Sequence, residues 1–213
     1  MIEITSITEV KKYLQGLKAV IFDLDDTLYS EKEYARSGYH AIANTLPQVE
    51  QLEEKLWTAF EQKKPAIDAV LIDEGIYTEG LKQQCLSIYR SHQPAIHFYE
   101  GAKELLCQLR YDGYKLGVIT DGRSEGQRAK IKALGLDELV DHIIITDELG
   151  GVEYRKPNKT AFVKMQELLD VPFEEMCYIG DNIKKDFVAP NMLGMRSIWF
   201  RNMDGLYSVQ ERI

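Results

Sequence analysis

A short apolar run that ends in three carboxylates is the feature that most constrains this chain. Residues 19–22 (AVIF) read as a buried β-strand, and Asp23, Asp25, Asp26 and Thr27 follow it. Strands buried on both faces of a parallel sheet are continuous apolar runs, and ligands of open α/β sheets bind beyond the carboxyl ends of the strands. Acids at such a position repel one another, so a cation must compensate them or their pKa values must rise. This pattern indicates a metal-assisted phosphoryl site; the alternative is an acidic turn that caps the next helix.

The overall composition is that of an ordinary globular protein. The chain has 213 residues, of which 45% are hydrophobic and 28% charged, enough for one large domain or a core with a smaller insert. Its net charge of −8 argues against nucleic acid or an anionic membrane as a partner. No apolar stretch approaches the roughly 20 residues of a membrane span, and the first eight residues do not read as a secretory signal.

The cysteines indicate a reducing compartment. Cys85, Cys107 and Cys177 lie far apart, their odd number cannot pair completely, and no CxxC motif occurs. We therefore expect neither a disulfide framework nor a zinc site, and a cytoplasmic location.

The second half of the chain alternates helix and strand patterns. Strands are predicted over 115–120, 142–145, 176–179 and 195–200, and helices over 102–112, 124–134, 159–170 and 183–193. Strands that alternate with helices of this length form right-handed crossovers and a parallel sheet covered on both faces. The expected fold class is therefore α/β, with a doubly wound parallel sheet.

A block without strand patterns lies between the first and second strands of this series. Its apolar residues recur at helical spacing, which predicts helices over 31–45, 50–63 and 78–91, while 66–76 is ambiguous. We therefore expect an α/β core formed by residues 1–28 and 95–213, and an inserted helical cap domain formed by residues 29–94.

Polar residues collect where the predicted strands end. The motifs are Thr120-Asp121-Gly122, Lys156-Pro157 and Gly180-Asp181, with Asp186 five residues beyond Asp181. Neighbouring strand ends of a parallel sheet would bring these groups to one edge. Oxygen ligands favour a hard cation such as Mg²⁺, and a lysine with backbone N–H groups at helix N-termini suits a phosphate. Each motif alone could be a turn, a helix cap or a solvated loop lysine; their conjunction favours the chemical interpretation.

These residues make the chain resemble the haloacid dehalogenase-like (HAD) hydrolase superfamily, in the subfamily I branch with a helical C1-type cap. The DxDx[TV] motif matches residues 23–27, the Thr or Ser at a strand end matches Thr120, and the lysine often followed by proline matches Lys156. The GDxxxxD motif matches residues 180–186. The resemblance covers about residues 18–200 and implies a Rossmann-like core.

The resemblance implies a magnesium-dependent phosphatase that acts on a small phosphorylated metabolite through an aspartyl-phosphate. Asp23 would be the nucleophile, and Asp25 would protonate the leaving oxygen and then activate water. The resemblance implies that Mg²⁺ is held by Asp23, the backbone carbonyl of Asp25, Asp181 and, directly or through water, Asp186. It also implies that the substrate phosphate is bound by Thr120, Asp121, Gly122 and Lys156, with Asp121 contributing its backbone N–H.

Several alternatives stay open. A phosphomutase uses the same nucleophile and acid, and a catalytically silent phospho-ligand binding protein could keep the same residues. True dehalogenases of the family lack the acid that Asp25 supplies, and receiver domains are shorter and have no cap, so both are disfavoured. The sequence leaves the oligomeric state open.

Substrate choice is the least determined property. Where many relatives carry Asn after the strand-end threonine, this chain has Asp121, and we hypothesise that Asp121 and Arg123 face the leaving group. The alternative is a solvent-facing helix cap. Residues that could contact the leaving group in the cap region are Tyr29, Tyr34, Arg36, His40 and Trp57, although aromatic residues at helical spacing are more often part of a core.

Overall fold

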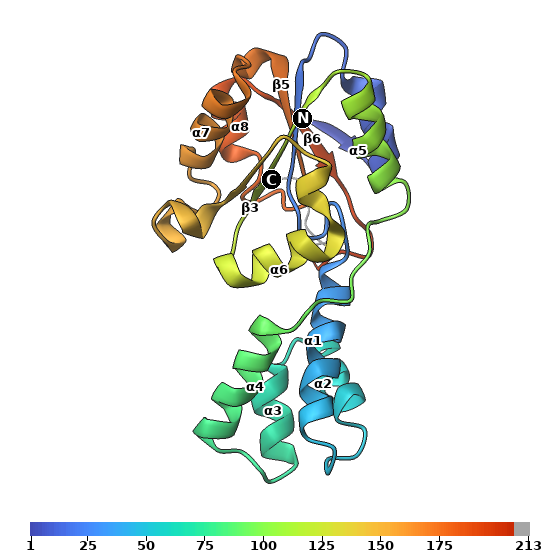
Figure 1. Cartoon of the computed structure of the whole chain (residues 1–213), viewed down its shortest axis with the longest axis vertical. Coiled ribbons are helices and arrows are strands. Elements are labelled where there is room, and N and C mark those ends of the chain that lie inside the picture. Colours follow the sequence, from blue (N-terminus) through green and yellow to red (C-terminus); the bar gives the residue numbers. More distant parts are fainter. Residues whose placement is uncertain (207–213) are drawn as a thin grey trace. The chain divides into compact units, whose positions relative to one another are not determined.

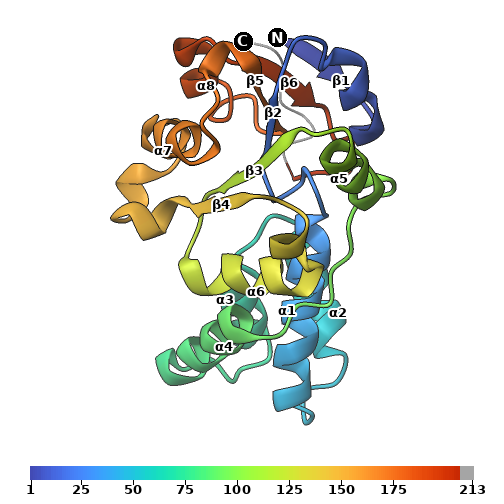
Figure 2. The same ribbon diagram turned by 45° about the horizontal axis from the view of Figure 1, so that its top comes forward.

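The computed structural model describes residues 1–206, and it divides into two compact units. One unit combines Met1–Glu31 with the chain from His97 onward, and the other is Lys32–Ile96. Figures 1 and 2 show the strands in the first unit and the bundle of α1–α4 in the second. Among residues 1–206, no helix combines the length and apolar content that a bilayer span requires.

The first unit contains a parallel sheet in the order β1-β6-β5-β2-β3-β4. Its strands are β1 (Ile2–Ile4), β2 (Ala19–Phe22), β3 (Lys115–Thr120), β4 (His142–Ile145), β5 (Met176–Gly180) and β6 (Arg196–Phe200). Its helices are α5 (Ala102–Tyr111), α6 (Ser124–Leu134), α7 (Thr160–Leu169) and α8 (Val188–Leu193). Its short 3₁₀ helices are η1 (Ile7–Tyr13), η2 (Leu136–Glu138), η3 (Thr146–Leu149), η4 (Val152–Tyr154) and η5 (Phe173–Glu175). The predicted α/β fold with a parallel, helix-covered sheet is confirmed.

The central strand β2 is buried at every residue and lies between β5 and β3. Phe22 pairs with Val118 of β3 and with Ile179 of β5, so the three strands end side by side. Helices α7 and α8 cover one face, where their apolar residues pack around Ile21, Ile119 and other sheet residues, and α5 covers the other (Figure 2). Gly117 permits this packing, because a Cβ there would lie 2.7 Å from the sulfur of Met165.

Two segments differ from the sequence-based expectation. Strand β1 was not predicted; it is only three residues long and pairs with β6 at the sheet edge. The helix predicted over 183–193 is wrong in its first half, since α8 begins only at Val188. The reason is local: Asn182 N–H donates to the carboxylate of Asp186, and the Asn182 side chain accepts from Lys184 N–H, which hold a turn instead of a helix.

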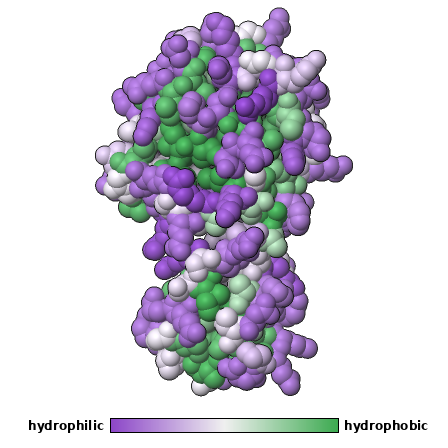
Figure 3. Space-filling view, in the orientation of Figure 1, coloured by the Kyte–Doolittle hydropathy of each residue, from purple (hydrophilic) through white to green (hydrophobic). Residues whose placement is uncertain are grey.

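The second unit consists of four helices with a hydrophobic core of their own. They are α1 (Glu31–Thr45), α2 (Leu52–Glu61), α3 (Ala66–Asp73) and α4 (Glu79–Ser91). The segment that was ambiguous in the sequence therefore contains the helix α3. The core gathers side chains from all four helices, among them Ile42, Leu56, Val70 and Cys85. In the view of Figure 3, hydrophilic residues surround areas of hydrophobic residues on the visible face of each unit.

Candidate active site

The carboxyl ends of β2, β3 and β5 carry the residues that the sequence singled out. Asp23 follows β2, and its backbone N–H donates to Ile179 O of β5 over 2.8 Å. Thr120 ends β3, and Asp181 follows β5. Because these three strands are neighbours, the parallel topology alone brings the three side chains to one edge.

Three carboxylates form the centre of this edge. Oxygen atoms of Asp23, Asp181 and Asp186 all lie within 4.8 Å of one another, and all three residues are buried. Burial and the carboxylates of Asp186 and Asp23 raise the pKa of Asp181 to about 9. Burial raises the pKa of Asp23 to about 7, although Lys156 opposes the shift. The repulsion expected from the sequence is therefore present, and it is relieved in part by a cation and in part by raised pKa values.

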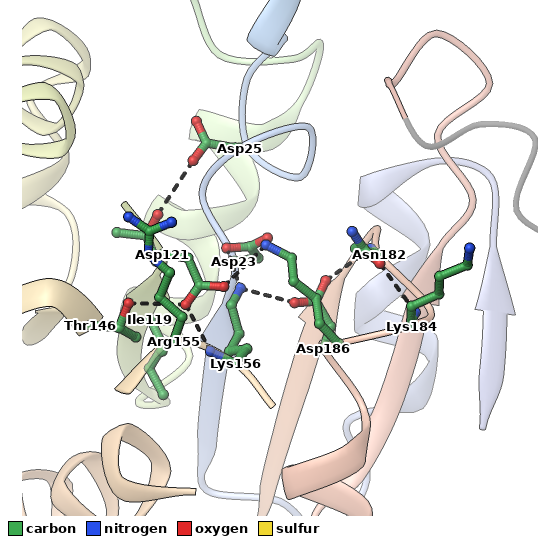
Figure 4. A network of polar contacts seen from close by, with 12 residues as sticks. Asp23, Asp25, Ile119, Asp121, Thr146, Arg155, Lys156, Asn182, Lys184 and Asp186 are labelled. Carbon is green, nitrogen blue, oxygen red and sulfur yellow. Dashed lines mark hydrogen bonds and ion pairs between the residues drawn. The ribbon is translucent and has the colours of Figure 1, made fainter. Parts of the chain in front are cut away.

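Lys156 is the cation within this cluster. Its Nζ lies 2.7 Å from Asp23 Oδ1 and 2.9 Å from Asp186 Oδ1 (Figure 4). It also donates to the hydroxyl of Tyr178 over 2.9 Å. Burial lowers the pKa of Lys156, but the charges of Asp186 and Asp23 outweigh burial and hold the pKa well above its usual value. Lys156 thus contacts two of the three carboxylates, and its single charge does not balance the cluster when all three are ionised.

Asp25 lies apart from that cluster, and Figure 4 shows its carboxylate away from those of Asp23 and Asp186. Its Oδ1 accepts from Lys130 Nζ over 2.6 Å and from the hydroxyl of Tyr29, while its Oδ2 accepts from Gln127 Nε2 over 2.8 Å. Burial raises the pKa of Asp25, but the charge of Lys130 and the hydrogen bonds from Lys130, Tyr29 and Gln127 bring it below its usual value. The Asp25 carboxylate is not part of the three-carboxylate cluster; its predicted metal ligand, the backbone carbonyl, remains a prediction.

Asp26 has a structural use. It adopts a left-handed backbone conformation with φ of 53°. Its carboxylate accepts from the backbone N–H of Glu31 over 2.9 Å and of Leu206 over 2.7 Å. These bonds tie the loop after β2 to the start of α1 and to the segment after β6.

The side chain of Asp121 holds the loop that carries Lys156. Its Oδ1 accepts from Lys156 N–H and from the Thr146 hydroxyl, each over 3.0 Å, and its Oδ2 lies 3.1 Å from Lys185 Nζ (Figure 4). Burial raises the pKa of Asp121, but Lys156 and Lys185 outweigh burial and lower it. These contacts give the carboxylate a supporting role instead of the hypothesised contact with a leaving group. Arg123 is exposed, and its part of that hypothesis remains a prediction.

Two glycines allow the close approaches at this edge. A Cβ at Gly180 would lie 2.4 Å from Asp186 Oδ2, although its backbone conformation is ordinary. Gly122 has φ of +137°, which disfavours any side chain, and a Cβ there would lie 3.3 Å from the Gln127 side chain.

The cap residues considered for substrate choice make contacts inside their own units. Arg36 pairs with Glu53 over 2.8 Å, and its guanidinium lies 5.1 Å from the ring centroid of Trp57. His40 Nδ1 is 2.8 Å from Glu53 Oε2. Tyr29 bonds to Asp25, as described above. These contacts assign none of them to a substrate.

Three further residues near the site were not predicted from the sequence: Gln127, Lys130 and Lys185. Gln127 and Lys130 are buried on α6 beside Ile131 and Leu134, so they occupy the inward face of that helix. Gln127 and Lys130 occupy positions of the helical repeat that are normally apolar, because an amphipathic helix directs its polar residues to solvent. This pattern in the sequence could have indicated that both side chains are buried. Lys185 stands inside the GDxxxxD motif, where spacing gives no direction to its side chain.

Comparison with known proteins identifies the family. The model of the haloacid dehalogenase-like hydrolase family matches residues 20–200. The chain belongs to this family. The resemblance found in the sequence motifs is thereby confirmed, and the protein is an enzyme of the HAD hydrolases.

Curated relatives of this HAD chain have phosphatase names. It is 28% identical to a glyceraldehyde 3-phosphate phosphatase of Pyrococcus abyssi, over 87% of this chain and 82% of the relative. It is 28% identical to the pyrophosphatase PpaX of Bacillus thuringiensis, over 78% of this chain and 75% of the relative. A solved HAD subfamily IA hydrolase from Geobacter sulfurreducens has the same fold, with a TM-score of 0.66 and 18% identity over 88% of both chains.

Proposed function

We propose that this HAD hydrolase is a magnesium-dependent phosphatase that hydrolyses a small phosphorylated metabolite through an aspartyl-phosphate on Asp23. The enzyme class, a phosphoric monoester hydrolase, follows from the family and from the named phosphatases among its relatives. Our proposal concerns the identity of the metal, the covalent intermediate and the substrate.

The observation that carries the proposal is the carboxylate cluster of Asp23, Asp181 and Asp186 with Lys156 in contact with it. An all-oxygen set of buried carboxylates suits Mg²⁺ better than zinc or a softer metal. The raised pKa values of Asp23 and Asp181 support the same fit, since Lys156 alone does not compensate their charge. When bound, Mg²⁺ would neutralise charge on the transferring phosphoryl group.

The chain's own residues would divide the reaction into two displacements. A carboxylate oxygen of Asp23 attacks phosphorus, the bond from phosphorus to the ester oxygen breaks, and the protonated form of Asp25 gives its proton to that oxygen. Water then attacks the phosphoryl group, gives a proton to Asp25, and releases inorganic phosphate and the free Asp23 carboxylate. Lys156, Thr120 and the backbone N–H groups of residues 121 and 122 would hold the phosphoryl oxygens.

The relatives guide the choice of substrate. Glyceraldehyde 3-phosphate is the first ester to test, because several curated relatives have a phosphatase name for it at 26–29% identity. Pyrophosphate, a phosphoric anhydride, is the second substrate to test, because of the similarity to PpaX. The presence of Asp25 supports an ester over a haloacid, since an alkoxide leaving group needs a proton and a halide does not.

The test combines phosphate release with trapping of the intermediate. The protein is assayed with Mg²⁺ on glyceraldehyde 3-phosphate, pyrophosphate, sugar phosphates and nucleotides, and products are examined for isomerised sugar phosphates. Acid-quenched enzyme should carry one phosphoryl group, visible as added mass, and Asp23→Asn should lose both this mass and the turnover. Turnover that survives Asp23→Asn would refute the mechanism, and activity that is unaffected by chelation would refute the metal.

A further inference from the structure

Two buried polar side chains on α6 contact Asp25 and have no role in the reaction as proposed. Lys130 Nζ lies 2.6 Å from Asp25 Oδ1, and Gln127 Nε2 lies 2.8 Å from Asp25 Oδ2. Gln127 is only 3% exposed and Lys130 only 5%. Burial of a charged or amide group is unfavourable unless it is paired and hydrogen-bonded, so their placement depends on these contacts.

We propose that Lys130 and Gln127 are positioning residues of the phosphatase reaction, which fix the carboxylate of Asp25 and the hydroxyl of Thr120 relative to each other. The inference rests on the proposed function, because it gives these residues an effect on proton transfer to the leaving group. Neither residue is assigned a contact with the phosphoryl group or the leaving oxygen, and both act through Asp25 or Thr120.

Gln127 connects the two groups directly. Its Nε2 donates to Asp25 Oδ2 over 2.8 Å and also donates to Thr120 Oγ1, and Thr120 Oγ1 lies 3.5 Å from the same Asp25 oxygen. A hydroxyl that accepts a hydrogen bond on one side keeps its own proton for an acceptor on another. Gln127 therefore directs the Thr120 proton, and a phosphoryl oxygen would be a stronger acceptor than the distant Asp25 oxygen. Gly122 leaves room for this amide, as its missing Cβ would lie 3.3 Å from it.

Lys130 fixes the other oxygen. Asp25 Oδ1 accepts from both Lys130 and the Tyr29 hydroxyl, and Lys130 Nζ lies 5.7 Å from the ring centroid of Tyr29. With donors on both oxygens, the carboxylate of Asp25 has one preferred orientation. A general acid must lie within hydrogen-bond reach of the oxygen that it protonates, so the loss of this orientation should slow the first displacement, which kcat/KM reports, only for esters whose leaving group needs the proton.

Leaving-group dependence separates positioning from general damage. Phenyl phosphate needs protonation of its leaving oxygen, whereas 2,4-dinitrophenyl phosphate leaves as a stable anion. Lys130→Met should lower kcat/KM on the order of 100-fold for phenyl phosphate and by less than about threefold for the dinitrophenyl ester. Asp25→Asn should show the same selectivity between the two esters. Lys130→Arg, which keeps the charge, should recover most of the loss. The matched control is Lys132→Met, an exposed lysine of the same helix, which should leave both rates unchanged.

Gln127→Met offers a second test that leaves Lys130 in place, with an expected loss on the order of 10-fold on phenyl phosphate alone. It also carries the comparison if Lys130→Met does not fold, which the dinitrophenyl rate would reveal. The inference would be overturned by equal losses on the two esters, by no loss, or by a gain on phenyl phosphate. In each of these cases an active wild type and an inactive Asp23→Asn would leave the proposed function standing. A wild type that releases no phosphate from any ester would refute the proposed function and the inference together.

Discussion

Alanine in place of Gly180 would test the metal cluster without removing any of its functional groups. The backbone of Gly180 has an ordinary conformation, so alanine brings no backbone strain there. Its Cβ, however, would lie 2.4 Å from Asp186 Oδ2, where 3.4 Å begins ordinary contact. The carboxylate of Asp186 must therefore move by about 1 Å, away from Lys156 Nζ, from the backbone N–H of Asn182, or from both.

The magnitude follows from that displacement. A misplacement of about 1 Å in a catalytic arrangement can reduce the rate about 100-fold. This corresponds to about 3 kcal/mol of transition-state free energy, since each factor of ten is about 1.4 kcal/mol. Because Asp186 would be a Mg²⁺ ligand, directly or through water, the concentration of Mg²⁺ that gives half-maximal rate should also rise.

The assay is kcat/KM for an active phosphate ester, measured over a titration of Mg²⁺. Gly80→Ala is the matched control: it makes the same substitution inside α4, and its Cβ would meet nothing closer than 4.0 Å. A Gly180→Ala enzyme with wild-type kcat/KM and an unchanged Mg²⁺ requirement would falsify the assignment of Asp186 to the metal cluster.

Three further predictions concern charge and packing. Lys156→Met leaves the carboxylates of Asp23 and Asp186 without their cation. Phosphate release should therefore be lost, and the free energy of unfolding in a urea titration should fall by about 3–5 kcal/mol. A variant as stable as the wild type would contradict this prediction. With metal chelated, the melting temperature should fall as pH rises from about 4 to about 9. Folding raises the pKa of Asp23 from 3.8 to about 7 and that of Asp181 from 3.8 to about 9. The folded state therefore binds protons more tightly than the unfolded state, and this stabilisation is lost as pH rises through that range. Calorimetry should then find a larger stabilisation by Mg²⁺ near pH 8 than near pH 5, and equal stabilisation would count against the cluster as the binding site. Gly38→Ala places a Cβ 2.5 Å from the Tyr89 ring, so it should destabilise the helical unit by about 1–3 kcal/mol in thermal or urea unfolding, and an unchanged stability would mean that the ring can yield.

The strand-rich part of the fold was readable because its central strands are buried on both faces. The runs without a charged residue at 19–22, 116–119 and 176–179 do not alternate between apolar and polar residues, and helices separate them, so a parallel sheet follows. Strand β1 was missed because it is three residues long and pairs only with β6, at the opposite end of the described chain. The first half of the 183–193 helix was mispredicted because side-chain bonds from Asn182 and Asp186 compete with helical ones.

The part of the candidate site that follows from the sheet topology alone could be predicted from the sequence. Parallel strands carry their following residues to one edge, so Asp23, Thr120 and Asp181 could be expected together without knowledge of any side-chain orientation. Gln127 and Lys130 could not be assigned in the same way, because α6 reaches the site through its inward face and not through a strand end. Their position depends on how α6 packs, although their spacing beside Ile131 already marked them as unusual.

Asp121 illustrates what one-dimensional patterns leave undecided. An additional carboxylate beside a bound phosphate dianion is unfavourable, so the residue type alone suggested either a contact with the leaving group or a solvent-facing cap. The structure resolves this conflict by direction: three donors from three different segments, Lys156, Thr146 and Lys185, surround the Asp121 carboxylate. Its charge is balanced by Lys185, and it supports the loop on which Lys156 stands. The same carboxylate that would repel a substrate thus helps to place the lysine that would attract it.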